Sequence, residues 1–387
     1  MFFSVKRLSL PARLIFVIVV QSLQGMEESI PCSPIVNLRG IVPGVVAPIG
    51  IGCTENGIVI SDKDAFNVWD MQKQKKFIGL TGGVHDFAVN RAGTKVAWSG
   101  GCCLAVYDAY SGEKEWHLIV QNSPIAFNHK DEVVVYQKTN NQWPLIICSK
   151  SSHRPIEWPD VSLQANDSFA HHPLKEQIVF GVASDTCYCG NYEQRNYTPF
   201  TLSFPDNFFA VGQLYNNDGS CVAIIGRSSW ETSIQFAAID PKAPSYMFPG
   251  QSTDIDLQKI CVAMAFHPNN KLFFLLDENN IIDCFHFETK KCIHSMCCKG
   301  QAKIPVNGNG LEKRLAFSRD AETLYVALKD KVVAIAVDDR KQQFFMLCAL
   351  MLYEHNNDLL PPDVVRIIMY NALKVSNAPL WSYLDKN

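Results

Sequence analysis

One stretch sets the structural repeat of this chain: residues 262–292 read VAMAFHPNNKLFFLLDENNIIDCFHFETKKC. Its apolar runs are separated by three polar turns, at Phe266–Asn270, Asp277–Asn280 and Phe287–Lys291. Short apolar runs bounded by Asn, Asp and Pro are typical of strands rather than helices. The stretch therefore predicts a unit of three successive strands, with a fourth beginning at Cys292.

The same unit recurs along most of the chain. First strands that end in a polar turn are found at residues 87–93, 125–131, 169–173, 213–219, 265–269 and 316–320. An incomplete copy precedes these six, with Gly57–Ile60 as its second strand and Phe66–Asp70 as its third. Between about residues 35 and 338 the sequence contains no convincing helical pattern. Internal repeats of this length indicate a repeat architecture such as a propeller.

The unit resembles the WD40 repeat. Val68-Trp69-Asp70 matches the dipeptide that ends a WD40 blade, and Val106-Tyr107-Asp108 repeats it with Tyr in place of Trp. Gly83-Val84-His85 is similar to the Gly-His pair that opens such a blade. The resemblance covers about residues 35–338, although only one blade keeps Trp-Asp. It implies an all-β fold: a β-propeller of seven four-stranded blades.

The last copy has only three strands, between Arg314 and Val337. A propeller closes such a blade with a strand from the other terminus, which removes exposed sheet edges. Residues Pro34–Ile41 are placed to supply that strand, so we expect the propeller to span residues 34–340. A β-sandwich or a pair of barrels built from the same strands is the alternative.

The first 25 residues have the layout of a secretory signal peptide. Lys6, Arg7 and Arg13 precede the apolar run 14–20, and a polar stretch ends at Gly25. The run is too short to span a bilayer, which needs about 20 residues. Residues 1–25 therefore predict export, with a secreted or periplasmic protein as the result. An uncleaved membrane anchor and a buried N-terminal segment remain alternatives.

Residues 341–387 follow a helical rather than a strand period and predict a C-terminal α-helical hairpin. Its second helix resembles the start of an F-box, and more loosely a SOCS box, at Leu360-Pro361, Asp363 and Ile367-Ile368. The resemblance implies an adaptor that recruits a ubiquitin ligase. The alternative is a hairpin that packs on the propeller and shields apolar surface.

The charge of the chain and the placement of its cysteines limit the kinds of ligand and metal that the chain is expected to bind. The net charge is −3 and no basic stripe is present, so neither nucleic acid nor an anionic membrane surface is indicated. Most of the 14 cysteines lie in strand-like runs, for example Cys221 and Cys261, where Cys acts as a small apolar residue. We expect core packing for most of them and one or two disulfides at most, rather than a metal site.

No catalytic motif is present in the sequence. Nucleophile elbows, phosphate loops and zinc-protease helices are all absent. His171 and His172 are adjacent, so on a strand they would point to opposite faces, and we interpret them as loop histidines. We therefore predict no catalytic, cofactor-binding or metal-binding residues. A hydrolase with acidic residues at the channel mouth stays open, because carboxylate pairs meet in space rather than in sequence.

These observations favour a monomeric, non-catalytic scaffold that presents a propeller surface to a protein or peptide partner. Function on rigid β scaffolds usually lies on the loops. Trp143, Trp158 and Trp230 lie in loop-like stretches, where each is either a partner contact or blade packing. The alternatives are the ligase adaptor and the propeller hydrolase.

Overall fold

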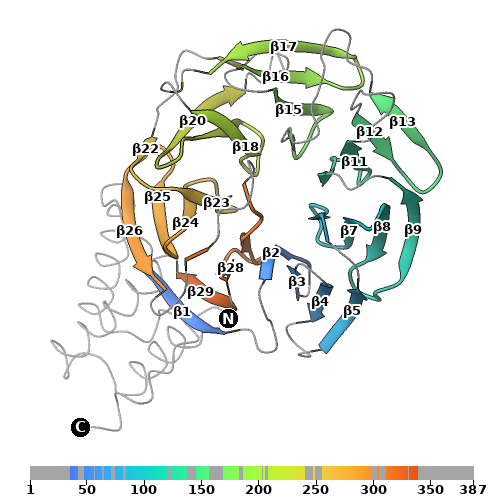
Figure 1. Cartoon of the computed structure of the whole chain (residues 1–387), viewed down its shortest axis with the longest axis horizontal. Coiled ribbons are helices and arrows are strands. Elements are labelled where there is room, and N and C mark those ends of the chain that lie inside the picture. Colours follow the sequence, from blue (N-terminus) through green and yellow to red (C-terminus); the bar gives the residue numbers. More distant parts are fainter. Residues whose placement is uncertain are drawn as a thin grey trace, which may run out of the picture. The chain divides into compact units, whose positions relative to one another are not determined.

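The computed structural model describes residues 35–338, except 42–47, 56, 63–64, 71–74, 82–83, 121–123, 137–144, 157–168, 183–185, 203, 205–207, 240–246, 249–254, 299–302, 305–310 and 330. Strands and turns make up these residues, with no helix among them. The strands form seven antiparallel sheets around a central axis, which is a seven-bladed β-propeller (Figure 1). The predicted fold class is therefore confirmed.

The first four blades follow one another along the chain. Blade 1 contains β2 (Pro48–Cys53), β3 (Gly57–Asp62), β4 (Ala65–Asp70) and β5 (Lys75–Thr81). Blade 2 contains β6 (Asp86–Val89), β7 (Lys95–Gly100), β8 (Cys103–Asp108) and β9 (Lys114–Ile119). Blade 3 contains β10 (Ile125–Phe127), β11 (Val133–Tyr136), β12 (Leu145–Cys148) and β13 (His153–Ile156). Blade 4 contains β14 (Phe169–His171), β15 (Gln177–Val182), β16 (Thr186–Asn191) and β17 (Asn196–Thr201).

The remaining blades depart slightly from this plan. Blade 5 contains β18 (Phe209–Tyr215), β19 (Cys221–Arg227) and β20 (Thr232–Ile239), and its outer position is shared by β21 (Met247–Phe248) and β22 (Ile255–Leu257). Blade 6 contains β23 (Cys261–Phe266), β24 (Leu272–Asp277), β25 (Ile281–His286) and β26 (Cys292–Cys297). Blade 7 contains β27 (Leu315–Phe317), β28 (Thr323–Ala327) and β29 (Val332–Asp338).

The N-terminal strand completes the last blade. β1 (Ile35–Ile41) pairs with β29, so blade 7 has the order β1-β29-β28-β27. This pairing confirms the closure that the sequence predicts for Pro34–Ile41. It leaves blade 7 with four strands like its neighbours, and it joins the two ends of the repeat array in one sheet.

Blade 1 is complete, although the sequence showed only its later strands. Its first strand, β2, contains Gly50 and Gly52, which interrupt the apolar pattern that marks strands elsewhere. A Cβ at Gly50 would lie 2.6 Å from Cε1 of Phe87 in blade 2. The glycine is therefore needed for close packing between blades, and this requirement removed the sequence signal for the strand.

The hydrophobic core is divided among the seven interfaces between neighbouring blades. Each cluster of buried side chains takes residues from two adjacent blades, and the cluster of Ile51 and Val332 joins blades 1 and 7. Alternation along each strand produces this division. In β3, Val59 packs toward blade 2, whereas Ile58 and Ile60 pack toward blade 7.

Polar side chains close the turns that follow the first strands. Asn90 accepts hydrogen bonds from the backbone N–H groups of Thr94 and Lys95, both at 2.8 Å. Equivalent residues cap the same turn in four other blades: Asn128, His172, Asn216 and His267. These capping residues are buried, so the turns are fixed by the fold. This explains the polar turns in the sequence repeat.

The predicted signal peptide (1–25) and helical hairpin (341–387) lie outside the described residues, as do Trp143 and Trp158. Within the described ranges, no helix is long and apolar enough to cross a membrane.

Candidate functional site

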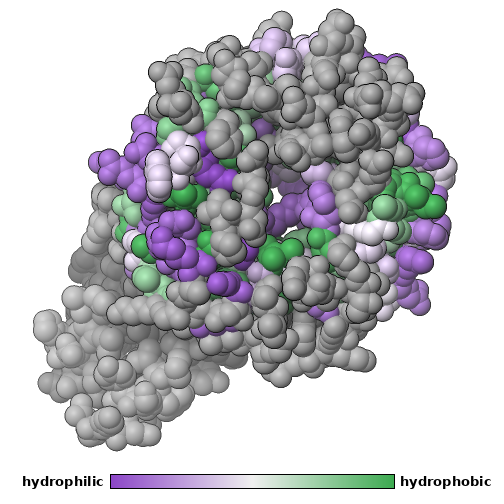
Figure 2. Space-filling model, viewed as in Figure 1, coloured by the Kyte–Doolittle hydropathy of each residue, from purple (hydrophilic) through white to green (hydrophobic). Residues whose placement is uncertain are grey.

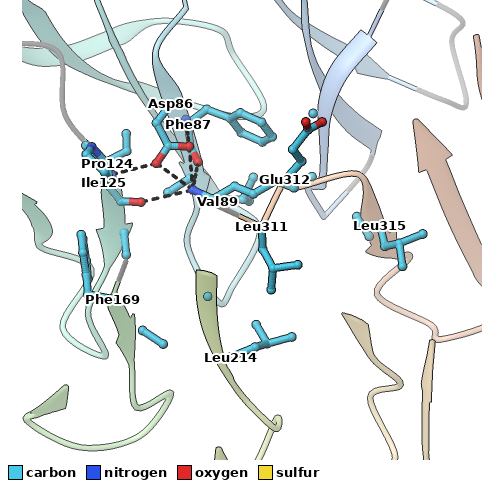
Figure 3. Close-up of a pocket in the computed structure, with 18 of the residues that line it drawn as sticks. Asp86, Phe87, Val89, Pro124, Ile125, Phe169, Leu214, Leu311, Glu312 and Leu315 are labelled. Carbon is cyan, nitrogen blue, oxygen red and sulfur yellow. Dashed lines mark hydrogen bonds and ion pairs between the residues drawn. The ribbon is translucent and has the colours of Figure 1, made fainter. Parts of the chain in front are cut away.

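The candidate site is the central channel of the propeller. The channel is a cavity of about 770 Å³ whose lining takes residues from the first strand of every blade. Figure 2 shows an opening near the centre of the propeller, and Figure 3 shows part of the lining. The innermost strands position these residues because each blade begins at the axis and extends outward.

Most of the channel wall is apolar. Phe87, Val89, Phe127, Phe169 and Leu214 all line the cavity, and they come from blades 2 to 5. A wall of this kind gives apolar ligand groups a place to be desolvated, while specificity rests on a small number of polar groups. The carboxylates of this lining are Asp86 and Glu312.

A short segment before β27, residues 311–314, connects several blades at the channel; we call it the channel segment. The Leu311 N–H donates to Val211 O at 3.1 Å in blade 5, and the Glu312 N–H donates to Val262 O at 2.9 Å in blade 6. In blade 1, the Ile51 N–H donates to Lys313 O at 2.6 Å. The segment thus bridges non-adjacent parts of the ring.

Leu311 packs directly on the backbone of blade 5. A Cβ at Gly212 would lie 2.6 Å from Cδ1 of Leu311. Gly212 lies in β18 at the position where the pairing register with β19 shifts. The absence of a side chain there lets the channel segment approach the strand closely.

Lys313 is held by acceptors from two blades. Its Nζ atom lies 2.9 Å and 3.0 Å from the two carboxylate oxygens of Asp86, and it also donates to Ile125 O at 3.3 Å. Figure 3 labels the acceptor residues Asp86 and Ile125. The same carboxylate accepts the backbone N–H groups of Phe87 and Ile125, each at 2.8 Å. Asp86 therefore organises the start of blades 2 and 3 and binds the channel segment at the same time.

Arg314 is the second cation of the channel segment and is only 2% exposed. Its guanidinium group donates to Pro48 O at 2.9 Å and to Ala327 O at 3.2 Å, and it forms an ion pair with Glu312. A buried guanidinium group needs a counter-charge and hydrogen-bond acceptors, and here Glu312 and the two carbonyl oxygens supply them. Arg314 therefore joins Pro48 of blade 1 to Ala327 of blade 7.

Both lining carboxylates are therefore bonded to cations. A glycosidase-type hydrolase needs two carboxylic groups facing one another across a substrate. In the described lining, Asp86 binds Lys313 and Glu312 binds Arg314. Both carboxylates therefore serve to hold the blades together. Among the described residues, no cluster of His, Cys, Asp and Glu has the geometry of a metal site. The hydrolase hypothesis receives no support from this lining.

The two adjacent histidines are not both in a loop. His171 ends β14, and its ring contacts Phe169 and Tyr192 between blades 3 and 4. His172 contacts Tyr215 of blade 5, and its Nδ1 accepts the Leu174 N–H at 3.0 Å. The predicted opposite orientation is confirmed, whereas the loop interpretation is wrong for His171. Burial lowers the pKa of His171 to about 3 and that of His172 to about 4, so both rings are neutral at pH 7.

Six of the twelve described cysteines are buried in the core, and all twelve are free thiols. Cys148, Cys221, Cys261 and Cys284 are buried free thiols in blades 3, 5 and 6. Burial raises the pKa of each of these four thiols to about 12. Because the thiolate is the reactive form, such thiols are chemically inert in the folded protein.

Comparison with known proteins adds evidence on the fold alone. No protein-family model matches the chain, and no curated protein matches its sequence. The chain is similar to the crystal structure of the Cps50 (Swd1) β-propeller domain from Myceliophteria thermophila, with a TM-score of 0.62 and 9% sequence identity. The match covers 79% of this chain and 100% of that domain. At this identity the likeness defines the class, a seven-bladed β-propeller, and nothing narrower.

Proposed function

We propose that this chain is a non-catalytic scaffold that presents the surface of its propeller to a protein or peptide partner. The observation that carries the proposal is the exposure of Trp230. Its side chain is 81% exposed, although tryptophan is among the residues that gain most from burial. Exposed aromatic residues on rigid turns are enriched among the contacts that dominate protein–protein binding.

The backbone beneath Trp230 is ordered by hydrogen bonds. It lies in the turn between β19 and β20, where the Ser228 hydroxyl oxygen accepts the N–H groups of Trp230 at 3.2 Å and Glu231 at 3.1 Å. Both flanking strands are almost wholly buried. The backbone that carries the indole is therefore held in place, so binding at this turn orders little additional backbone.

The channel also supports a binding role over a catalytic one. Its charged groups bind one another and hold the blades together, through Lys313 with Asp86 and Arg314 with Glu312. Groups used in this way stabilise the ring, and their partners within the fold occupy them.

The test is affinity purification of tagged full-length chain from its native cell, with quantitative mass spectrometry of what co-purifies. We expect a partner that is enriched by the wild-type chain and lost with Trp230→Ala. Tyr110→Ala is the matched control, since Tyr110 is also an exposed aromatic residue, at 64%, but lies on a turn of blade 2. If Trp230→Ala and Tyr110→Ala recover every protein equally, and both unfold at the same temperature as the wild type, the role of Trp230 is contradicted.

A further inference from the structure

The mouth of the channel, at the ends of the first strands, is formed by the residues that follow the buried caps. Pro173 follows His172 and Asn217 follows Asn216, and both line the cavity. The Arg91 guanidinium group, which follows Asn90, donates to Pro173 O at 3.3 Å. That bond joins blade 2 to blade 4 across the rim, so Arg91 lies at the channel mouth.

A second arginine reaches the same part of the rim. Arg319 follows the equivalent position in blade 7 and donates to Ala92 O at 2.7 Å, next to Arg91. It also lies 3.4 Å from Glu55, and both of these side chains are more than half exposed. An ion pair in that environment is strongly screened by water and is worth little. The glutamate therefore only partly offsets the charge of Arg319.

Two cations at this mouth have no carboxylate partner among the described residues. Arg91 binds a neutral carbonyl group, and Lys175, two residues after Pro173, is in no ion pair there. Acids also lie nearby: Glu176, which follows Lys175, lies 3.0 Å from Lys130, and the exposed Asp131 is on the turn of blade 3. On the turn of blade 5, the Asp218 carboxylate accepts the Ser220 N–H at 2.9 Å. None of these acids forms an ion pair with Arg91 or Lys175 among the described residues, so both cations can pair with a carboxylate of a ligand.

An apolar residue stands between these cations. Leu174 is 48% exposed at the tip of the blade 4 turn, between Pro173 and Lys175. Behind this turn the cavity wall continues with Val89 and Phe127. An apolar contact with cations beside it is complementary to a segment of the opposite charge pattern.

We propose that this surface, the mouth patch of Arg91, Leu174, Lys175 and Arg319, binds a partner segment in which an apolar side chain is flanked by Asp or Glu. This rests on the proposed scaffold function and adds the chemistry of the ligand. The apolar side chain packs on Leu174 and enters the cavity, where its surface is removed from water. The flanking carboxylates pair with Arg91 and Lys175; the arginine fork accepts a carboxylate in bidentate geometry.

The test begins with a phage-displayed library of random peptides selected on the full-length chain. We expect the enriched sequences to carry Leu, Ile, Phe or Met flanked by acidic residues. The most enriched peptide is then labelled and its affinity measured by fluorescence anisotropy. We expect Arg91→Glu and Lys175→Glu each to weaken binding about tenfold or more, because each places a like charge against the peptide. Arg91→Lys keeps the charge but loses the bidentate fork, so it should weaken binding less than Arg91→Glu does. Added salt should weaken binding to the wild-type chain.

Lys114→Glu is the matched control, since Lys114 is an exposed lysine at the start of β9, the outer strand of blade 2. It should leave the affinity unchanged. Lys175→Glu breaks no hydrogen bond of the fold that the structure shows, so its effect is not one of misfolding, and circular dichroism checks each variant. If the enriched peptides are basic or uncharged, or bind Arg91→Glu as tightly as wild type, the mouth patch is overturned while the scaffold proposal stands. If no peptide is enriched and no partner depends on Trp230, both proposals fall.

Discussion

The Lys313 ammonium group lies 2.9 Å from the carboxylate of Asp86, a residue 227 positions earlier in the chain. This ion pair joins the segment that enters the last blade to the first strand of blade 2. The ring is therefore closed in two places. At the outer edge of the propeller β1 pairs with β29, and at the central channel Lys313 pairs with Asp86.

The pair should contribute measurably to stability. Asp86→Ala removes the acceptor of Lys313 and of two backbone N–H groups, so we expect a loss of about 1–3 kcal/mol in the free energy of unfolding. Lys313→Ala should cost less, about 1 kcal/mol, because the lysine is 43% exposed and water screens the pair. Urea unfolding of both variants measures the difference. Lys303→Ala is the control, since Lys303 pairs with Glu278 while 70% exposed and should cost almost nothing.

The N-terminal strand should be required for a closed ring. Deleting residues 35–41 leaves β29 as an unpaired edge, which invites association with other chains. We expect a lower melting temperature and concentration-dependent aggregation in light scattering. Deleting residues 26–33 instead keeps the strand and is the control. If the chain without residues 35–41 is monomeric and equally stable, β1 is dispensable.

His172 should make stability depend on pH. Its pKa is lowered from 6.5 to about 4 by burial, so the unfolded chain takes up the proton first as the pH falls. Stability is therefore unaffected above about pH 6.5 and decreases as the pH drops from there toward 4. His172→Asn keeps a side-chain acceptor, as at Asn90 and Asn128, without a titrating group. We expect urea midpoints of this variant to vary less between pH 4 and 6.5; part of the dependence remains because His171 is also buried and neutral.

Thiol reactivity should follow burial. Cys292 and Cys297 are exposed and should react with iodoacetamide in the native protein. Cys221 and Cys261 should react only after unfolding, because they are buried and their pKa is raised to about 12. Peptide mass spectrometry with and without denaturant resolves the four sites. Equal labelling of Cys221 and Cys292 in the native state would mean that blade 5 opens readily.

Export and the role of the C-terminal residues can be tested together on protein from its native cell. We propose that residues 1–25 are removed, so the mature chain should begin near residue 26 by N-terminal mass spectrometry. Deletion of residues 341–387 should lower the melting temperature if the predicted hairpin packs on the propeller. A propeller that stays equally stable while a helical partner is lost would instead support the adaptor hypothesis, and an intact Met1 would remove the prediction of cleavage.

The sequence by itself determined the blades. Strand alternation and turn residues act over a few positions, so a stretch such as 262–292 was enough to predict three strands of a blade. The missing strand of the last repeat indicated its completion by residues 34–41. The exception was β2, where close packing on Phe87 requires glycine and erases the apolar pattern.

Only the tertiary structure decided the channel and its mouth. Alternation placed His171 and His172 on opposite faces but did not say that both faces are buried between blades. The sequence around Asp86 does not indicate that Lys313 binds it. The sequence around Arg91 does not indicate that Pro173 and Arg319 lie beside it. Such pairs depend on which strand ends meet across the ring, and closure of seven blades brings together residues that are far apart along the chain. The local sequence encodes each blade, whereas the ion pairs of the channel form only when the ring is closed.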